Sequence, residues 1–141
     1  MSYKITARIY QTNTNTYFHL VEQTVWNYAN GGTWTEANGE KTLTIGGSGT
    51  SGTLRFESDT GERFIVAIGV HNYKRWVDIV TGLAPDQTGV VINAEYYNNV
   101  RSFAREKQLS TYTVTSKAGR KFTATYTVAE GNDLKLNIII G

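Results

Sequence analysis

Residues 46–52 (GGSGTSG) contain glycines at the spacing G-x-G-x-x-G, which is the spacing of a dinucleotide-binding turn. Such a turn holds a pyrophosphate where a helix begins directly after it, because the free amides of the helix N-terminus bind phosphate oxygens. The next residues read TLRFES, and Leu54 and Phe56 alternate there with polar residues in the period of a strand. The pattern predicts a glycine connection between strands, whose main chain can approach a ligand closely, and argues against a nucleotide site.

Side chains suited to catalysis are few. The chain has two histidines, His19 and His71, and no cysteine, so the usual zinc ligand sets cannot assemble. No serine lies in a G-x-S-x-G elbow. Asp78 with Glu57 or Glu95 leaves a glycosidase pair open, although nothing in their spacing supports it. We therefore expect no enzyme, no metal and no cofactor.

Two segments pair aromatic with amide side chains, namely WNYANGG (26–32) and HNYKRW (71–76). A sugar offers hydroxyl groups and one apolar C–H face, so its site needs fixed donors and acceptors beside an aromatic platform. These segments and the exposed main chain of the glycine loop favour a site for a neutral sugar. The alternative stays open that Asn30 and Asn72 are turn residues and that Tyr28 and Tyr73 are packing residues.

The elements that must position these segments are mostly strands. Alternating patterns cover residues 3–12, 18–28, 32–45, 53–58, 63–73, 74–80, 110–116, 121–130 and 134–140. Asn38-Gly39 and Ala118-Gly119 predict tight turns between them. In KFTATYTVA, the pattern places Phe122, Ala124, Tyr126 and Val128 on one face.

The middle of the chain reads differently. Pro85 and Asp86 are a helix start signal, and apolar residues then follow at helical spacing. We expect short helices at 86–95 and 101–107, joined by YYNN. Many strands with one helical interruption predict a mainly β, antiparallel sandwich, and no linker divides the single domain 1–141.

Composition narrows the classes of partner. The formal net charge is +2, with both signs mixed along the chain, so a nucleic-acid partner is not expected. The densest basic spot is Lys74 and Arg75 beside Tyr73 and Trp76, which leaves single-stranded nucleic acid as a minor alternative. The N-terminus lacks the apolar stretch of a signal peptide, and no run is long enough to cross a bilayer, so we expect a cytoplasmic protein.

Six longer segments carry a resemblance that extends over essentially the whole chain. They are YANGGTW (28–34), GGSGTSGTLRF (46–56), GVHNYKRWVDIVT (69–81), VINAEYY (91–97), AREKQL (104–109) and the ending NIIIG. In order and spacing they resemble the fungal fruit-body lectin family. The resemblance implies an actinoporin-like β-sandwich with two antiparallel sheets linked by a short helix-loop-helix. It also implies a homotetramer that binds glycans of glycoproteins or glycolipids and serves in defence or storage.

The resemblance further implies two separate sugar sites. One recognises galactosyl-β1,3-N-acetylgalactosamine, the T-antigen type of O-glycan, and the other takes terminal N-acetylglucosamine. Carried over by motif, the first site uses Ala29, Ser48, Gly49, Asn72 and Tyr73, with Tyr28, Asn30 and His71 as neighbours. The second uses Asp78, Ile79, Val80, Thr81, Arg101 and Tyr112.

Within these motifs, the resemblance assigns individual roles. The Ser48 hydroxyl, the Gly49 amide and the Ala29 carbonyl fix the hydroxyls of N-acetylgalactosamine. In the second site Asp78 accepts sugar hydroxyls, and the methyl groups of Ile79 and Val80 line the acetyl pocket.

Two positions depart from the family pattern. Val77 stands where the family often has cysteine, and it should point away from Asp78 into packing. The segment YYNNVRSF varies in length within the family, so Arg105 competes with Arg101 for the second site.

A membrane-active toxin is the alternative function, because the actinoporin-like architecture is shared. The strand-like N-terminus argues against the inserting helix that a pore former needs.

Overall fold

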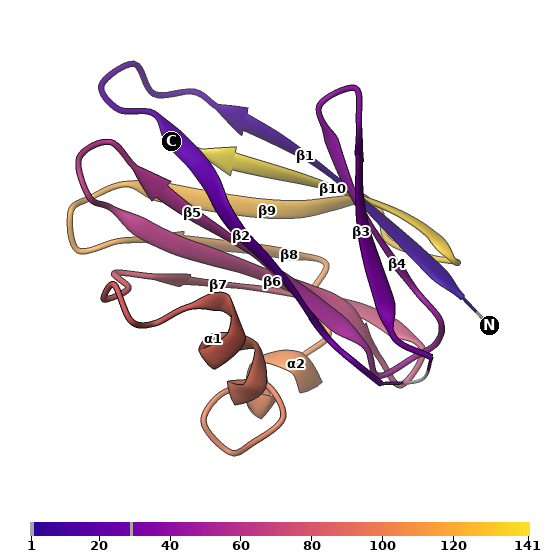
Figure 1. The fold of residues 1–141 in the computed structure, drawn as a ribbon. Coiled ribbons are helices and arrows are strands. Elements are labelled where there is room, and N and C mark those ends of the chain that lie inside the picture. Colours follow the sequence, from indigo (N-terminus) through magenta and orange to yellow (C-terminus); the bar gives the residue numbers. More distant parts are fainter. Residues whose placement is uncertain (1, 29) are drawn as a thin grey trace.

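The computed structural model describes residues 2–28 and 30–141 as two stacked β-sheets with a pair of short helices (Figure 1). The six-stranded sheet has the order β3 (Gly32–Ala37), β4 (Glu40–Ile45), β1 (Tyr3–Gln11), β10 (Asp133–Ile140), β9 (Lys121–Val128) and β8 (Thr111–Thr115). The four-stranded sheet has the order β2 (Phe18–Trp26), β5 (Ser51–Ser58), β6 (Arg63–His71) and β7 (Lys74–Thr81). The predicted mainly β fold is confirmed.

Most strand pairs are antiparallel, as expected, but β1 and β10 run parallel to each other. Antiparallel neighbours follow from tight turns such as Asn38-Gly39, which joins β3 to β4 with φ of 54° and 77°. No turn joins β1 to β10, because they lie at opposite ends of the sequence, so alternation alone left their relative direction open.

The main core fills the space between the sheets. It contains a cluster of phenylalanine rings near the β5–β6 turn at one end of the sheets, because Phe56 pairs with Phe64 beside that turn and Phe18 begins β2 opposite Ser58. The ring centroid of Phe64 lies 4.8 Å from that of Phe56, 5.4 Å from that of Phe18 and 4.3 Å from that of Phe122. Burying each phenyl ring stabilises the fold by about 1.5–3 kcal/mol relative to exposure, so the four rings together contribute about 6–12 kcal/mol.

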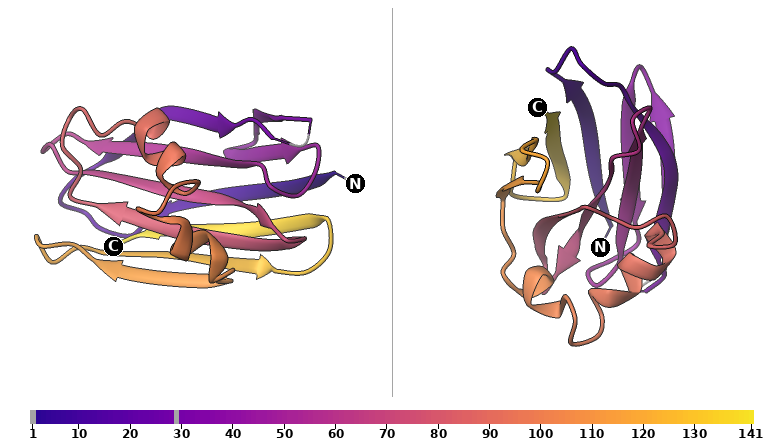
Figure 2. Two further views of the ribbon diagram at one scale, coloured as in Figure 1. Left: turned by 90° about the horizontal axis from the view of Figure 1, so that it is seen from below. Right: turned by 90° about the vertical axis from the view of Figure 1, so that its left-hand side faces the viewer.

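Helices α1 (Gly89–Glu95) and α2 (Ser102–Glu106) lie against the outer face of the four-stranded sheet (Figure 2). Ile65 and Trp76 of the sheet pack there with Ile92, Tyr96 and Ala104 in a second core. Strand β6 is thus covered on both faces, which explains its nearly continuous apolar run FIVAIGV.

Both helices are shorter than predicted. Residues 84–87 form a turn in which the main-chain amide of Gln87 donates to the Ala84 carbonyl, and Thr88 caps α1 by accepting from the Val91 amide. The helix therefore begins at Gly89, after the threonine cap, and not at Asp86.

A second departure lies in β9. Phe122, Ala124 and Tyr126 face the core as predicted, but Val128 is 39% exposed. A bulge opposite Lys135 and Leu136 shifts the register of β9 by one residue, and this turns Val128 to the solvent.

Candidate functional site

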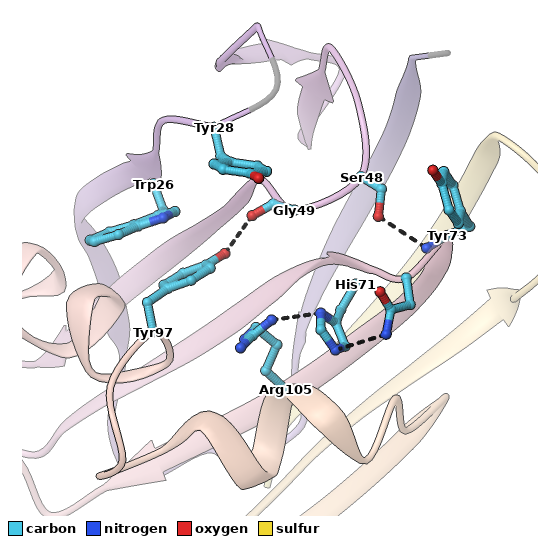
Figure 3. Close-up of a pocket in the computed structure, with 9 residues that line it drawn as sticks. Trp26, Tyr28, Ser48, Gly49, His71, Tyr73, Tyr97 and Arg105 are labelled. Carbon is cyan, nitrogen blue, oxygen red and sulfur yellow. Dashed lines mark hydrogen bonds between the residues drawn. The ribbon is translucent and has the colours of Figure 1, made fainter.

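A pocket of about 540 Å³ opens where the β6–β7 turn, the glycine loop and α2 meet (Figure 3). Its lining residues come from five separate segments of the chain. They are Trp26, Tyr28, Ser48, Gly49, His71, Asn72, Tyr73, Tyr97 and Arg105. The structure thus brings together the described members of the first predicted set, while Ala29 lies outside the described residues.

The β6–β7 turn presents Asn72 and Tyr73 at the pocket mouth. Both residues have left-handed backbones, with φ of 48° and 67°, as a two-residue hairpin turn requires. Asparagine tolerates this region, whereas a tyrosine there stores strain of order 1–3 kcal/mol. The Tyr73 amide donates to the hydroxyl oxygen of Ser48 over 3.0 Å, which holds the turn against the glycine loop. The Tyr73 ring is 78% exposed, so it provides an aromatic surface at the rim.

Gly49 fits because it has no side chain. Its φ is 108°, and an added Cβ would lie 2.7 Å from Cε1 of the Tyr28 ring. Its amide donates to the Val70 carbonyl over 2.7 Å, and its carbonyl accepts from the Tyr97 hydroxyl over 2.8 Å. The amide is therefore already paired within the protein, so Gly49 shapes the floor and does not supply the free donor that the resemblance implied.

One wall of the pocket is a stack of flat groups. The rings of Trp26 and Tyr97 are nearly parallel, with centroids 4.4 Å apart and an interplanar angle of 7°. The guanidinium carbon of Arg105 lies 4.9 Å from the centre of the Tyr97 ring. Stacking on a ring fixes both the position and the plane of an arginine.

A buried polar network fixes this wall to the sheet beneath it. The Tyr97 hydroxyl lies 2.7 Å from the Ser51 hydroxyl, which donates to Oδ1 of Asn93 over 3.1 Å. Nδ2 of Asn93 in turn donates to the Thr24 hydroxyl over 3.2 Å. Because these buried polar groups have partners, their hydrogen bonds offset the loss of water and hold the helical segment on the sheet.

Arg105 also contacts His71 inside the pocket. Its Nη1 lies 2.5 Å from Nδ1 of His71, and its Nε donates to the Tyr96 carbonyl over 2.9 Å. Burial, followed by the charge of Arg105, lowers the pKa of His71, and Glu106 opposes this in part. Arg105 thus lies in the first pocket, so it is not positioned to replace Arg101 at the second.

The second predicted set centres on Asp78, which is only 9% exposed. The Tyr96 hydroxyl donates to its Oδ2 over 2.6 Å. Burial raises the pKa of Asp78, while the hydrogen bonds from Tyr96 and the Ile79 amide and the charge of Arg101 lower it. Burial and then the charge of Asp78 raise the pKa of Tyr112, which also packs against the core between the sheets.

The remaining members of this set divide between the two faces of β7. Val80 packs with the helices on the same face as Asp78. The Ile79 side chain is 4% exposed and lies in the core between the sheets, as does that of Val77. Thr81 lines a separate hollow of about 270 Å³ with Ser116 and Phe122. Because side chains alternate along a strand, the Ile79 side chain points away from Asp78 and does not line an acetyl pocket there, as the resemblance had implied. The main-chain amide of Ile79 still hydrogen-bonds to Asp78.

Comparison with known proteins identifies the class of this protein. The family described as "Fungal fruit body lectin" matches residues 1–138. The chain belongs to this family. It is therefore a carbohydrate-binding lectin, and the resemblance seen in the sequence is confirmed.

Individual relatives are similar to the lectin in sequence and fold over almost its full length. It is 60% identical to the "Boletus edulis lectin" of Boletus edulis over 141 residues, which is 99% of either chain. Its fold matches the crystal structure of wild-type Xerocomus chrysenteron lectin with a TM-score of 0.98 and 64% identity, covering 100% of both chains. A substituted form of that Xerocomus lectin matches with the same TM-score and covers 99% of that chain.

Three residues of the lectin's first pocket were missed by sequence reasoning, namely Trp26, Tyr97 and Arg105. Each lies in a segment already noted, since Trp26 opens WNYANGG, Tyr97 ends VINAEYY and Arg105 is in AREKQL. The missing information was how the helical segment docks on the sheet, which depends on long-range contacts.

Two features are absent from residues 2–28 and 30–141 of the lectin. No group of three or more His, Cys, Asp or Glu side chains in this part is arranged to hold a metal ion. Neither helix in this part is long and apolar enough to cross a membrane.

Proposed function

We propose that the lectin binds galactosyl-β1,3-N-acetylgalactosamine in the pocket around Ser48, Asn72 and Tyr73. The observation that carries the proposal is the joining of Ser48 to the β6–β7 turn, which places a hydroxyl, an amide and an aromatic ring at one mouth. A pocket of about 540 Å³ falls within the 300–1,000 Å³ range of small-ligand sites.

Each group in this pocket has a distinct role in the proposal. The Ser48 oxygen accepts the Tyr73 amide proton, so its own proton is free to donate to a sugar hydroxyl. The Asn72 amide offers a second polar contact, and the exposed rings of Tyr28 and Tyr73 offer apolar surface to the C–H face of a sugar. An equatorial C4 hydroxyl in place of the axial one would leave these polar groups unpaired, which gives selectivity for the galacto configuration.

For the second site, we propose terminal N-acetylglucosamine beside Asp78. Oδ2 of Asp78 accepts from Tyr96, and its remaining lone pairs are acceptors for sugar hydroxyls. Nε of Arg101 donates a hydrogen bond to Oε1 of Glu95 over 2.7 Å. The Nη1 and Nη2 atoms of Arg101 can then donate to a sugar. Tyr112 supplies the packing surface, and Val80 the apolar contact for the acetyl group.

The wider role that we propose is non-catalytic recognition of glycans by a homotetramer in fungal defence. The absence of catalysis is supported by the hydrogen bonds of the nearby carboxylates. Asp78 accepts from Tyr96 and Glu95 accepts from Arg101, so both carboxylates already have partners within the protein. Incubation with an aryl N-acetylgalactosaminide tests this, and steady release of the aryl group would contradict it.

The membrane-active alternative is disfavoured by the N-terminus, because residues 3–11 form strand β1 at the centre of a sheet. Dye release from phosphocholine liposomes without glycans would favour this alternative over a lectin.

A glycan array with three proteins tests the two-site proposal. Wild type should bind both galactosyl-N-acetylgalactosamine and terminal N-acetylglucosamine. Asn72→Ala should lose only the first activity, and Asp78→Ala only the second, because the two sites share no residue. If either variant lost both activities while remaining folded, two independent sites would be ruled out.

A further inference from the structure

Three side chains form a continuous polar chain from α2 to the pocket mouth (Figure 3). Nη1 of Arg105 lies 2.5 Å from Nδ1 of His71, and the opposite ring nitrogen, Nε2, lies 3.4 Å from Nδ2 of Asn72. The His71 main chain is held as well, because Nε2 of Gln108 donates to its carbonyl over 2.6 Å. The imidazole is therefore fixed between an arginine and the asparagine of the sugar site.

The arginine determines which ring nitrogen carries the proton. A guanidinium group has donors only, so Nδ1 of His71 must offer its lone pair to Arg105. In a neutral imidazole the proton then resides on Nε2. Both burial and the charge of Arg105 favour the neutral ring by lowering the pKa of His71.

This tautomer in turn determines the orientation of the Asn72 amide. Nε2–H of His71 is a donor, and it faces the amide end of Asn72. Two donors cannot bond each other, and half a turn about χ2 exchanges the amide nitrogen and oxygen. With Oδ1 directed at Nε2–H, both groups are paired, and Nδ2 of Asn72 is free to donate to a ligand.

We propose that Arg105 and His71 are positioning residues that present the donor of Asn72 to the sugar, and that acid weakens the first site by protonating His71. The inference rests on the proposed disaccharide site. It assigns no ligand contact to either residue, since both act through the amide of Asn72.

The charges around His71 determine what acid does. Arg105 faces the ring from α2, Glu106 of the same helix lies 4.0 Å from Nη2 of Arg105, and Lys74 is paired opposite His71 on β7. The other titratable side chains that line the pocket are Tyr28, Tyr73 and Tyr97. A protonated His71 keeps its Nε2–H donor but has no lone pair for Arg105 and becomes a second cation beside it. The hydrogen bond to Arg105 is then lost, and charge repulsion displaces the ring that orients Asn72.

The sugar-binding test uses His71→Gln, His71→Leu and Arg105→Met, with calorimetric titration of the disaccharide between about pH 7.5 and pH 5. Glutamine can accept from Arg105 and donate to Asn72, so His71→Gln should keep most of the affinity and lose the acid sensitivity. His71→Leu and Arg105→Met should bind about 5-fold more weakly at neutral pH, the cost of about one hydrogen bond. Binding of N-acetylglucosamine at neutral pH checks that each variant is folded.

Two outcomes would overturn the inference. One is a His71→Leu protein that binds the disaccharide as tightly as wild type at neutral pH. The other is a His71→Gln protein that loses affinity in acid as wild type does, because the titrating group would then lie elsewhere.

A second measurement needs no sugar. Nitrogen-15 NMR of the imidazole in the free lectin should show the Nε2–H tautomer for His71 in wild type, and this preference should weaken in Arg105→Met. His19→Gln assigns the signals, since the chain has two histidines. An Nδ1–H tautomer in wild type would refute the proposal even if the disaccharide binds. Failure of the disaccharide to bind, with the expected tautomer present, would instead count against the proposed function.

Discussion

The hydroxyl oxygen of Ser48 lies 3.0 Å from the main-chain nitrogen of Tyr73 and accepts its proton, although 25 residues separate the two in sequence. This bond joins the glycine loop before β5 to the turn between β6 and β7. Both segments line the first pocket, so the bond fixes the relative position of the groups that we propose contact the disaccharide. The strained backbone of Tyr73 is stabilised by the same contact.

Removing this hydroxyl should therefore have two effects at once. Ser48→Ala deletes a donor to the sugar and also frees the Tyr73 turn, so disaccharide affinity should fall about 10-fold or more, equivalent to about 1.4 kcal/mol or more. Isothermal titration measures it. Thr115→Ala, an exposed position on β8, is the control and should bind normally. Unchanged affinity in Ser48→Ala would exclude a role for the hydroxyl.

Gly49 and Gly61 form a matched pair for testing the floor of the pocket. Both have positive φ, 108° and 90°, but an added Cβ at Gly49 meets the Tyr28 ring, whereas at Gly61 it meets nothing within 4 Å. Each alanine variant should lose about 1 kcal/mol of unfolding free energy from backbone strain. Gly49→Ala should in addition displace Tyr28 and weaken disaccharide binding, while Gly61→Ala should bind as wild type does. Equal binding by the two variants would contradict the proposed place of the sugar.

Tyr73→Gly tests whether the lectin gives up stability for its binding site. Glycine adopts a φ of 67° without strain, so the free energy of unfolding should rise by about 1 kcal/mol. The same change removes the exposed ring, so disaccharide affinity should fall. Thermal unfolding and titration on one preparation measure both quantities. A variant that is both more stable and equally active would show that the ring has no role in binding.

Strand alternation in the sequence predicted a large part of this fold. It placed Phe122, Ala124 and Tyr126 on one face, which is the core face, and directed Val77 away from Asp78 into packing, because the side-chain period of a strand is fixed by the main chain. It could not give the parallel pairing of β1 with β10 or the bulge that exposes Val128, since both depend on partners distant in sequence.

The candidate site was predictable only in part, for the same reason. The motifs that carry the family resemblance are local, so the resemblance named Ser48, Asn72 and Tyr73, which line one pocket in the structure. The choice between Arg101 and Arg105 required the docked position of α2, which no local pattern encodes. The pairing of the Gly49 amide with Val70 was equally hidden, because it crosses from the loop to β6.

Asp78→Asn should separate stability from sugar binding at the second site. Burial raises the pKa of Asp78, so the native protein binds its proton more tightly than the unfolded chain does. The free energy of unfolding contributed by this group then falls as pH rises through the interval from the unfolded pKa, about 3.9, up to the native pKa. At neutral pH the asparagine variant, which still accepts from Tyr96, should be more stable than wild type, and the difference should shrink below about pH 4.

The same substitution should weaken N-acetylglucosamine binding, since an amide has one acceptor oxygen where the carboxylate has two. Chemical unfolding at several pH values measures the stability difference, and titration with N-acetylglucosamine measures the affinity. Disaccharide binding at neutral pH is the control, because Asp78 does not line the first pocket. A variant less stable than wild type at neutral pH would mean that the attraction of Arg101 and Lys107 outweighs the burial of the charge.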